Sequence, residues 1–124
     1  PLTTGTAPYQ ITAYPTWCGK DLVVIVGGGT RPHIGAVALA TPRPSLKQND
    51  TVSASASVLC SLGHKDDLPA RELALLLASL LNTTVTVTAG IHLDEAKPED
   101  LEILHQNWQK LTKLLQEKLS SQKL

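Results

Sequence analysis

Alternation of apolar and polar side chains predicts five β-strands in this chain. Between residues 51 and 62, valine, alanine and cysteine alternate with serine, which is the period of two that a half-buried strand shows. Threonine takes the place of serine in a second alternating segment, residues 83–89. Three further strands are expected at residues 9–17, 21–26 and 36–40, where β-branched and other apolar side chains gather between glycine and proline.

A spacing of three and four residues between apolar side chains predicts two helices. The first is expected at residues 68–81, with Asp66 or Asp67 at its N-terminal cap and Pro69 in its first turn. Its buried face comprises Leu73, Leu76, Leu77, Leu80 and Leu81. Because little polar surface remains on this helix, we expect it to be buried in an oligomer as well as in the monomer. The second helix opens near Pro98, and its apolar face comprises Leu101, Leu104, Trp108, Leu111 and Leu115.

The element order β-β-β-β-α-β-α indicates an α+β fold, in which a mostly antiparallel five-stranded sheet is packed by two main helices. A length of 124 residues leaves room for a single domain, residues 1–124. Residues 27–35 are expected to form a loop, because three consecutive glycines and a proline disfavour both helix and strand. Residues 41–50 are expected to be irregular as well. Cys18 and Cys60, which form no CxxC pair, are expected to be reduced core residues.

The charge balance and the hydropathy of the chain argue against two classes of partner. With 11 basic and 11 acidic residues the formal charge is zero, so no excess positive potential attracts nucleic acid or an anionic membrane. No apolar run reaches the ~18 residues that a membrane span requires, and neither end has the pattern of a signal peptide. We therefore expect a cytoplasmic protein. Its two tryptophans and two tyrosines offer few rings on which a flat ligand could stack.

Three of the four histidines, His33, His64 and His92, lie in glycine-flanked segments at the ends of predicted strands. Such loops expose functional groups, and three neutral imidazoles with an open position suit zinc or a similar divalent metal. Their spacing matches no local metal motif, and a lone histidine more often braces a loop than binds a metal. A shared site and three separate structural roles therefore both remain open. His105 lies inside the second helix near its apolar face and is interpreted as a packing or boundary residue.

The glycine run and one lysine offer two places for an anion. Backbone amides of residues 27–30 could face a phosphate, and Arg31 follows them with a guanidinium that binds phosphate through paired hydrogen bonds. The run is neither a dinucleotide-binding motif nor a P-loop, because Pro32 and His33 stand where a helix should begin. Lys65 precedes the first helix, whose N-terminus favours an anion. A plain turn and a solvated lysine remain the simpler interpretations.

Three segments of the sequence, in this order and at this spacing, resemble one protein family. They are Gly28-Gly29-Thr30-Arg31-Pro32-His33-Ile34-Gly35, His64-Lys65-Asp66 and Thr86-Val87-Thr88-Ala89-Gly90-Ile91-His92. The likeness is to the LpdD-like prenylated-flavin chaperones, the small third component that accompanies gallate decarboxylase and related UbiD-type enzymes. The resemblance implies a protein that binds prenylated flavin mononucleotide (prenylated FMN) and delivers or protects it for a UbiD-type apo-decarboxylase. Decarboxylation itself then belongs to that partner.

The resemblance also implies which residues hold the cofactor. The expected cofactor-binding set is Gly29, Thr30, Arg31, His33, His64, Lys65, Gly90 and His92. Within this set Thr30, Arg31 and Lys65 suit the phosphate of the cofactor. His33, His64 and His92 are the expected ligands of a divalent metal, and Asp66 is expected to orient one of them.

Two other functions stay open at this point. One is a small enzyme that uses a three-histidine metal and its bound water. The other is a structural accessory subunit of a decarboxylase complex, with no affinity for flavin. A two-fold homodimer is expected for a chain with such a leucine-rich helix, because small soluble domains commonly pair in this way.

Overall fold

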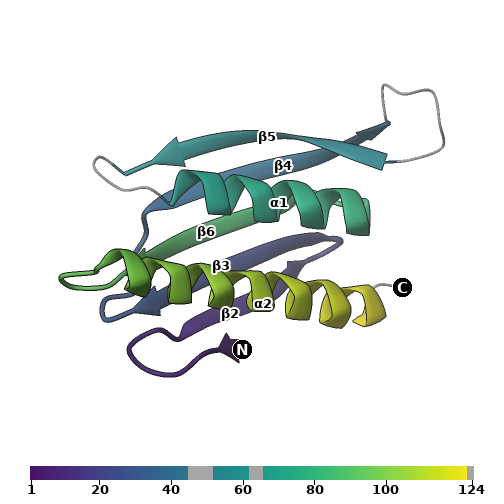
Figure 1. The fold of residues 1–124 in the computed structure, drawn as a ribbon. Coiled ribbons are helices and arrows are strands. Elements are labelled where there is room, and N and C mark those ends of the chain that lie inside the picture. The colour runs from purple at the N-terminus through teal and green to yellow at the C-terminus, as the bar shows by residue number, and fades with distance from the viewer. Residues whose placement is uncertain (45–51, 62–65, 123–124) are drawn as a thin grey trace.

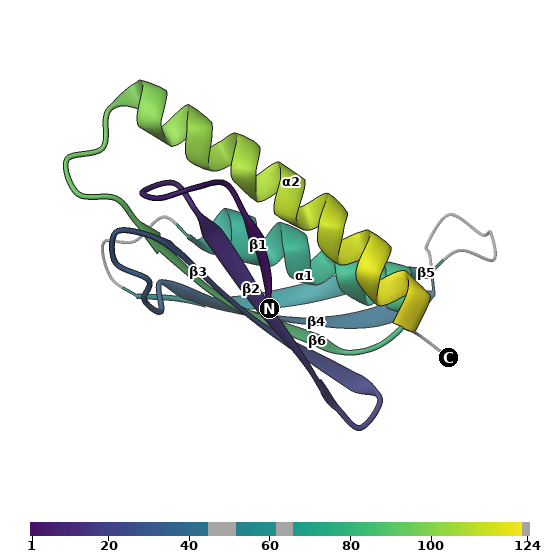
Figure 2. The same cartoon turned by 90° about the horizontal axis from the view of Figure 1, so that it is seen from below.

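The chain folds into a mixed six-stranded sheet with both helices on one face. The computed structural model describes residues 1–44, 52–61 and 66–122. The elements are β1 (Leu2–Thr4), β2 (Ile11–Cys18), β3 (Asp21–Gly29), β4 (Ala36–Pro44), β5 (Val52–Cys60), α1 (Asp67–Leu81), β6 (Val85–His92) and α2 (Pro98–Gln122). The strand order across the sheet is β1-β2-β3-β6-β4-β5. Figure 1 shows α1 and α2 packed over the sheet with their axes roughly along the strands, and Figure 2 shows that both lie on the same side of it.

Two helices against a mostly antiparallel sheet confirm the predicted α+β class. The pairs β1–β2, β2–β3, β4–β5 and β4–β6 are antiparallel. In contrast, β3 and β6 are parallel, because α1 carries the chain back along the sheet before β6 begins. The additional strand, β1, is too short to show an alternating pattern in the sequence. It is held from the helical side, where Thr4 Oγ1 donates a hydrogen bond of 2.7 Å to the backbone oxygen of Asn107 in α2.

Two strands run further than their composition predicts. Residues 27–29 were expected to be loop, but they continue β3 and pair with residues 90–92 of β6. Glycine suits this stretch because a Cβ on Gly28 would lie 2.7 Å from the backbone oxygen of Gln10 in the neighbouring chain segment. Similarly, β4 continues to Pro44 instead of ending at residue 40. Its prolines are tolerated because β4 pairs with β6 only as far as residue 40, so the proline-bearing end has one free edge. Residues 45–50 of the predicted irregular segment lie outside the described residues.

The core lies between the sheet and the two helices. From α1 it takes Ala70, Leu73, Ala74, Leu77, Ala78 and Leu81, and from α2 it takes Leu104, Asn107, Leu111, Leu115 and Leu119. The predicted helical faces are therefore right in the main but wrong at Leu80 and Leu101, which are 46% and 56% exposed. The sheet of the same chain buries Leu73, Leu77 and Leu81, whereas Leu68 and Leu80 stay exposed in the monomer, so burial of α1 in an oligomer stays a prediction. No helix in the described part of the chain is long and apolar enough to cross a membrane.

Both cysteines are exposed, so their interpretation as core residues was wrong. Cys60 is the last residue of β5, the edge strand of the sheet, and Cys18 pairs with Asp21 at the end of the β2–β3 hairpin. Strand ends at a sheet margin are covered by little other structure. The alternation that led to the interpretation is nevertheless real, because Ala54, Ala56 and Val58 of β5 pack against the core.

The face of the sheet opposite the helices is uncovered and uncharged over its centre. Residues in register form one row across five strands, comprising Tyr14, Ile25, Thr88, Val37 and Leu59. The next row comprises Thr16, Val23, Thr86, Leu39 and Ser57. Tyr14, Ile25, Leu39 and Leu59 are among the large apolar side chains that the monomer leaves exposed. We call these two rows the open sheet face.

Candidate functional site

The C-terminal ends of β3 and β6 lie side by side and gather several of the predicted site residues. Because the two strands are parallel, both end at the same margin of the sheet, with Gly29 opposite His92. After β3 the chain turns over the end of β6, and the backbone amide of Thr30 donates a hydrogen bond of 2.7 Å to the oxygen of His92. We call residues 29–35 and 90–94 the corner.

Glycine is required at two positions of the corner by close backbone approach. Gly29 has a φ of +78°, and a Cβ built on it would lie 2.1 Å from the backbone oxygen of His92. A Cβ on Gly90 would lie 1.8 Å from the backbone oxygen of His33. Both distances are far below van der Waals contact, so no larger residue fits without moving the backbone. The two glycines therefore set how closely the segments that carry His33 and His92 approach each other.

His33 and His92 come from different segments and lie near each other. Their ring centroids are 6.3 Å apart and the rings are almost perpendicular, at 80°. Nδ1 of His33 lies 3.1 Å from the backbone oxygen of Arg31, an acceptor, so Nδ1 donates this bond when it carries the proton. Nε2 of His33 lies 3.6 Å from Oδ2 of Asp66, while Oδ1 of Asp66 accepts from the amide of Ile91 at 3.3 Å. Asp66 thus faces the predicted histidine, and its side chain does not cap α1.

Arg31, His92 and Asp94 form a polar cluster at the surface of the corner. Nη2 of Arg31 lies 2.7 Å from Oδ1 of Asp94 and 2.9 Å from Nε2 of His92. Nε2 of His92 is also 2.9 Å from the same carboxylate oxygen. Because one ring nitrogen cannot donate to Asp94 and accept from Arg31 together, the tautomer of His92 decides which bond forms. Thr30 completes the cluster, since its Oγ1 accepts from the amide of Asp94 at 3.1 Å.

Electrostatics in this cluster favours a charged Asp94. The hydrogen bond from His92 and, after it, the Arg31 guanidinium lower the pKa of Asp94 below its ordinary value, against a partial opposing effect of desolvation. The side chains of Arg31 and Asp94 are 68% and 55% exposed, so water screens the pair and its contribution to stability is small. The Arg31–Asp94 pair instead fixes the position of Arg31, because Asp94 holds the guanidinium beside His92.

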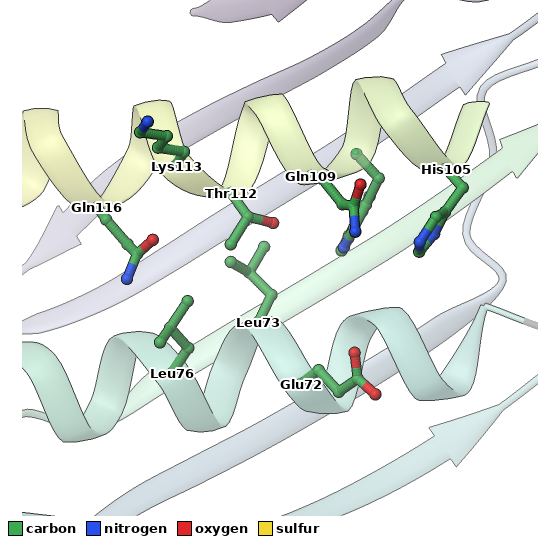
Figure 3. Close-up of a pocket in the computed structure, with 9 residues that line it drawn as sticks. Glu72, Leu73, Leu76, His105, Gln109, Thr112, Lys113 and Gln116 are labelled. Carbon is green, nitrogen blue, oxygen red and sulfur yellow. The ribbon is translucent and has the colours of Figure 1, made fainter. Parts of the chain in front are cut away.

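Three adjoining hollows lead away from the corner. The first has a volume of about 390 Å³ and is lined by Arg31, Pro32, His33 and His92. The second, of about 580 Å³, shares His92 with the first and lies between the start of α1 and the start of α2. The third, of about 590 Å³, shares Glu72, His105 and Trp108 with the second and continues between the two helices, as Figure 3 shows. We call the second and third hollows the groove.

One family model matches a stretch of the chain that includes both the corner and the groove. Residues 5–120 match the family model described as "Prenylated flavin chaperone LpdD-like domain". The chain belongs to this family. A curated relative, Protein LpdD of Lactiplantibacillus plantarum, is 35% identical over 96 residues, which make up 76% of this chain and 65% of the relative. The matched stretch is thus slightly shorter than two-thirds of that LpdD protein. The resemblance drawn from three short segments of the sequence is confirmed.

The structure of this LpdD-like chain brings together the predicted residues that it describes. Gly29, Thr30, Arg31, His33, Gly90 and His92 all belong to the corner. His64 and Lys65 lie outside the described residues, so their place relative to the corner is untested. Among the described residues no group of three His, Cys, Asp or Glu side chains could hold a metal ion. The three-histidine metal site depends on His64 and therefore stays a prediction.

The groove was not found from the sequence of this LpdD-like chain. His105, interpreted as a packing or boundary residue, and Trp108, assigned to the apolar face of α2, lie three residues apart, and both line the two hollows of the groove. Trp108 also contacts the core and is only partly buried. The sequence does contain one sign of this pocket. A histidine and a tryptophan on the same side of an amphipathic helix place polar ring atoms at the boundary between its apolar and polar faces. The opposite wall comes from α1, and sequence alone does not show that the two helices lie together.

Proposed function

We propose that this chain binds prenylated FMN at the corner and the groove and delivers or protects it for a UbiD-type apo-decarboxylase. The observation that carries the proposal is the family match, which spans residues 5–120 and so includes both regions. The hollows suit an elongated organic ligand, since their volumes fall within the ~300–1,000 Å³ usual for small-molecule sites. In this proposal the decarboxylation is carried out by the partner.

The corner is the better place for the cofactor phosphate. Arg31 lines the first hollow, and a guanidinium carries five N–H donors, more than its contacts with His92 and Asp94 use. The N-terminal turns of α1 and α2 carry acidic residues, Asp67 in α1 and Glu99 and Asp100 in α2, which disfavour an anion there. A bound phosphate would compete with Asp94 for Arg31, so binding would exchange one anionic partner for another.

A divalent metal is the open part of the proposal. His33 and His92 supply two imidazoles within one hollow, and His64 would have to supply a third. If a metal is held there, it would provide a positive charge next to the cofactor. The alternative function, a small three-histidine enzyme, requires the same metal and also requires that the chain alone turns over a substrate. Metal analysis of the purified protein, with and without chelator, separates a metal-dependent site from one made by Arg31 alone.

Calorimetry under anaerobic conditions tests the proposed function directly. Purified chain is titrated with prenylated FMN, with FMN as the control ligand, and each titration is repeated after chelation. We expect tighter binding of prenylated FMN than of FMN and no turnover of aromatic acids by the chain alone. Transfer is then measured as decarboxylase activity that appears when the loaded chain is mixed with apo-decarboxylase. Failure of both ligands to bind would contradict the proposal and favour a structural accessory subunit.

We also propose that the chain forms a homodimer through the open sheet face. A two-fold axis places this face against a copy of itself, and its two rows contain no charged residue that would meet a like charge. The whole outer side of five strands about eight residues long, of which the open sheet face is the central part, covers on the order of 600 Å² at ordinary strand spacing. Two such faces would bury about 1,200 Å², the lower end of the range for stable interfaces.

Light scattering coupled to size-exclusion chromatography measures this association. Ile25→Asp puts a charge into the centre of the open sheet face, at a side chain that is 49% exposed. The matched control is Leu80→Asp, since Leu80 of α1 is 46% exposed but lies on the opposite side of the molecule. We expect a dimer for the natural chain and for Leu80→Asp and a monomer for Ile25→Asp. A natural chain that elutes as a monomer would overturn the homodimer and leave the open sheet face to the decarboxylase.

A further inference from the structure

We infer that the groove between α1 and α2 seats the isoalloxazine ring system of the flavin, with Trp108 as the side chain on which the ring stacks. The inference rests on the proposed function and adds to it the ring-binding residues. It assigns the phosphate and the ring to two different regions joined at His92, which lines both the first and the second hollow.

The groove and the corner together match the shape of a flavin nucleotide. From Leu101 to Gln116, the groove-lining residues of α2 span about 22 Å at the helical rise per residue. This length accommodates a ring system and the ribityl chain that links it to the phosphate. The phosphate at Arg31 and the ring beside Trp108 would place the ribityl chain past His92, at the junction of the hollows.

The lining of the groove suits a flat ligand with one apolar side and a polar edge. Leu73 and Leu76 point from α1 towards α2, while Gln109 and Thr112 point back from α2, as Figure 3 shows. Leu73, Leu76 and Trp108 give the third hollow its apolar wall, and the rest of its lining is polar or charged. An apolar surface with polar groups at its edge can bind a ring and fix its orientation. Trp108 adds an indole, the largest aromatic surface a protein offers for stacking.

Exposed apolar side chains at the rim point to the same occupant. Leu101 is 56% exposed and Leu68 is 61% exposed, and both line the second hollow. Prenylation adds hydrocarbon to the flavin ring system, and burial of apolar area is favourable by about 25 cal/mol per Å². Contact with Leu101 and Leu68 would therefore favour the prenylated cofactor over plain FMN, although the phosphate of both ligands is the same.

Nuclear magnetic resonance of the full chain tests this assignment without relying on activity. The chain has two tryptophans, so its spectrum contains two indole N–H signals, and Trp17→Phe identifies the one that belongs to Trp108. Ring currents shift only protons close to a bound aromatic ring. We expect prenylated FMN to shift the Trp108 indole signal strongly and to leave the Trp17 signal in β2 in place. Trp17→Phe should keep the affinity of the natural chain.

Two variants then measure the contribution of the groove to binding. Trp108→Leu keeps an apolar side chain but removes the stacking surface, and we expect it to weaken prenylated FMN binding about tenfold. Leu101→Ser changes an exposed side chain, so the variant should fold normally. Its affinity for prenylated FMN should fall more than its affinity for FMN, so the ratio of the two affinities should decrease. Circular dichroism confirms the fold of each variant.

The outcomes separate this inference from the proposed function. Calorimetric binding of prenylated FMN with an unmoved Trp108 signal and unchanged affinity in Trp108→Leu would overturn the ring assignment and leave the chaperone proposal standing. Absence of binding in the natural chain would overturn the proposed function itself. A shifted Trp108 signal together with weakened binding in Trp108→Leu would support both.

Discussion

The corner and the groove lie next to each other but are built in opposite ways. Backbone hydrogen bonds and two space-limited glycines define the corner, so its side chains are held by short local contacts. Side chains of two helices line the groove, and several of them, such as Leu101, are exposed. A region determined by backbone suits recognition of a small group of fixed shape, such as a phosphate. A region lined by exposed side chains suits a larger ring that must enter and leave.

The largest effect is expected where the backbone of the corner has no spare room. Gly90→Ala places a Cβ 1.8 Å from the backbone oxygen of His33, and the required shift should destabilise the chain by about 3 kcal/mol. Gly19→Ala is the matched control, because its Cβ would meet nothing within 4 Å. Its φ of +61° still imposes a cost of about 1 kcal/mol on a non-glycine residue. Urea denaturation measures both variants. Equal stability of the two variants would mean that the backbone of the corner shifts to admit the extra Cβ. That result would contradict the description of the corner as a region fixed by its backbone.

An intermediate effect is expected from removing the cation of the corner. Arg31→Ala should weaken the binding of prenylated FMN and of FMN by a similar factor, since both carry the same phosphate. Loss of a charge-assisted hydrogen bond corresponds to about 1.5–3 kcal/mol, or roughly 10- to 150-fold in affinity. Arg31→Lys keeps the charge without the paired donors and should recover part of the loss.

The two-ligand comparison makes this result specific to the corner. Changes at Leu101 or Leu68, at the rim of the groove, should alter the ratio of the two affinities, whereas changes at Arg31 should leave the ratio unchanged. Calorimetry with both ligands measures the ratio directly. An Arg31→Ala variant that loses affinity for prenylated FMN alone would contradict the division of roles between corner and groove.

The contrast between a corner defined by backbone and a groove lined by side chains also explains what could be predicted from the sequence. The corner was predictable because its signals are local and specific: glycines next to histidines at strand ends mark close backbone approach and exposed function. Even there the sequence did not show that residues 27–29 extend β3, because whether glycine tolerates a strand depends on what the neighbouring strand leaves room for. The six-stranded order was also beyond prediction, since β6 inserts between β3 and β4 through long-range pairing.

The groove was not predictable for a related reason. Periodicity identified both helices and most of their buried residues, but it cannot say which surface of one helix faces the other. Leu101 follows the apolar spacing of α2 and was assigned to the core, yet it precedes Leu104, the first buried residue of α2, and is exposed at the second hollow. Trp108 likewise was assigned to packing alone. By its spacing in the sequence, a residue that lines a pocket as well as contacting the core cannot be distinguished from a residue that is only buried in the core.

The smallest effect is expected from the charge of Asp94, and its sign is defined. The pKa of Asp94 in the folded chain is below the ordinary 3.8, so the charged form contributes stability above that value, and this contribution is lost as pH falls through the lowered pKa. Asp94→Asn should remove this part of the acid sensitivity. Asp100 is the matched comparison, because the amide of Lys97 and then the hydroxyl of Tyr9 lower its pKa in the same direction.

Titration of the carboxyl carbons by nuclear magnetic resonance separates the two carboxylates. In Arg31→Ala we expect the pKa of Asp94 to rise towards its ordinary value while that of Asp100 stays where it is, because only Asp94 contacts the guanidinium. The rise should be partial, since the hydrogen bond from His92 remains and has the larger effect. An unchanged Asp94 titration in Arg31→Ala would mean that the pair does not form in solution. Arg31 would then be positioned for a phosphate by the backbone of the corner alone.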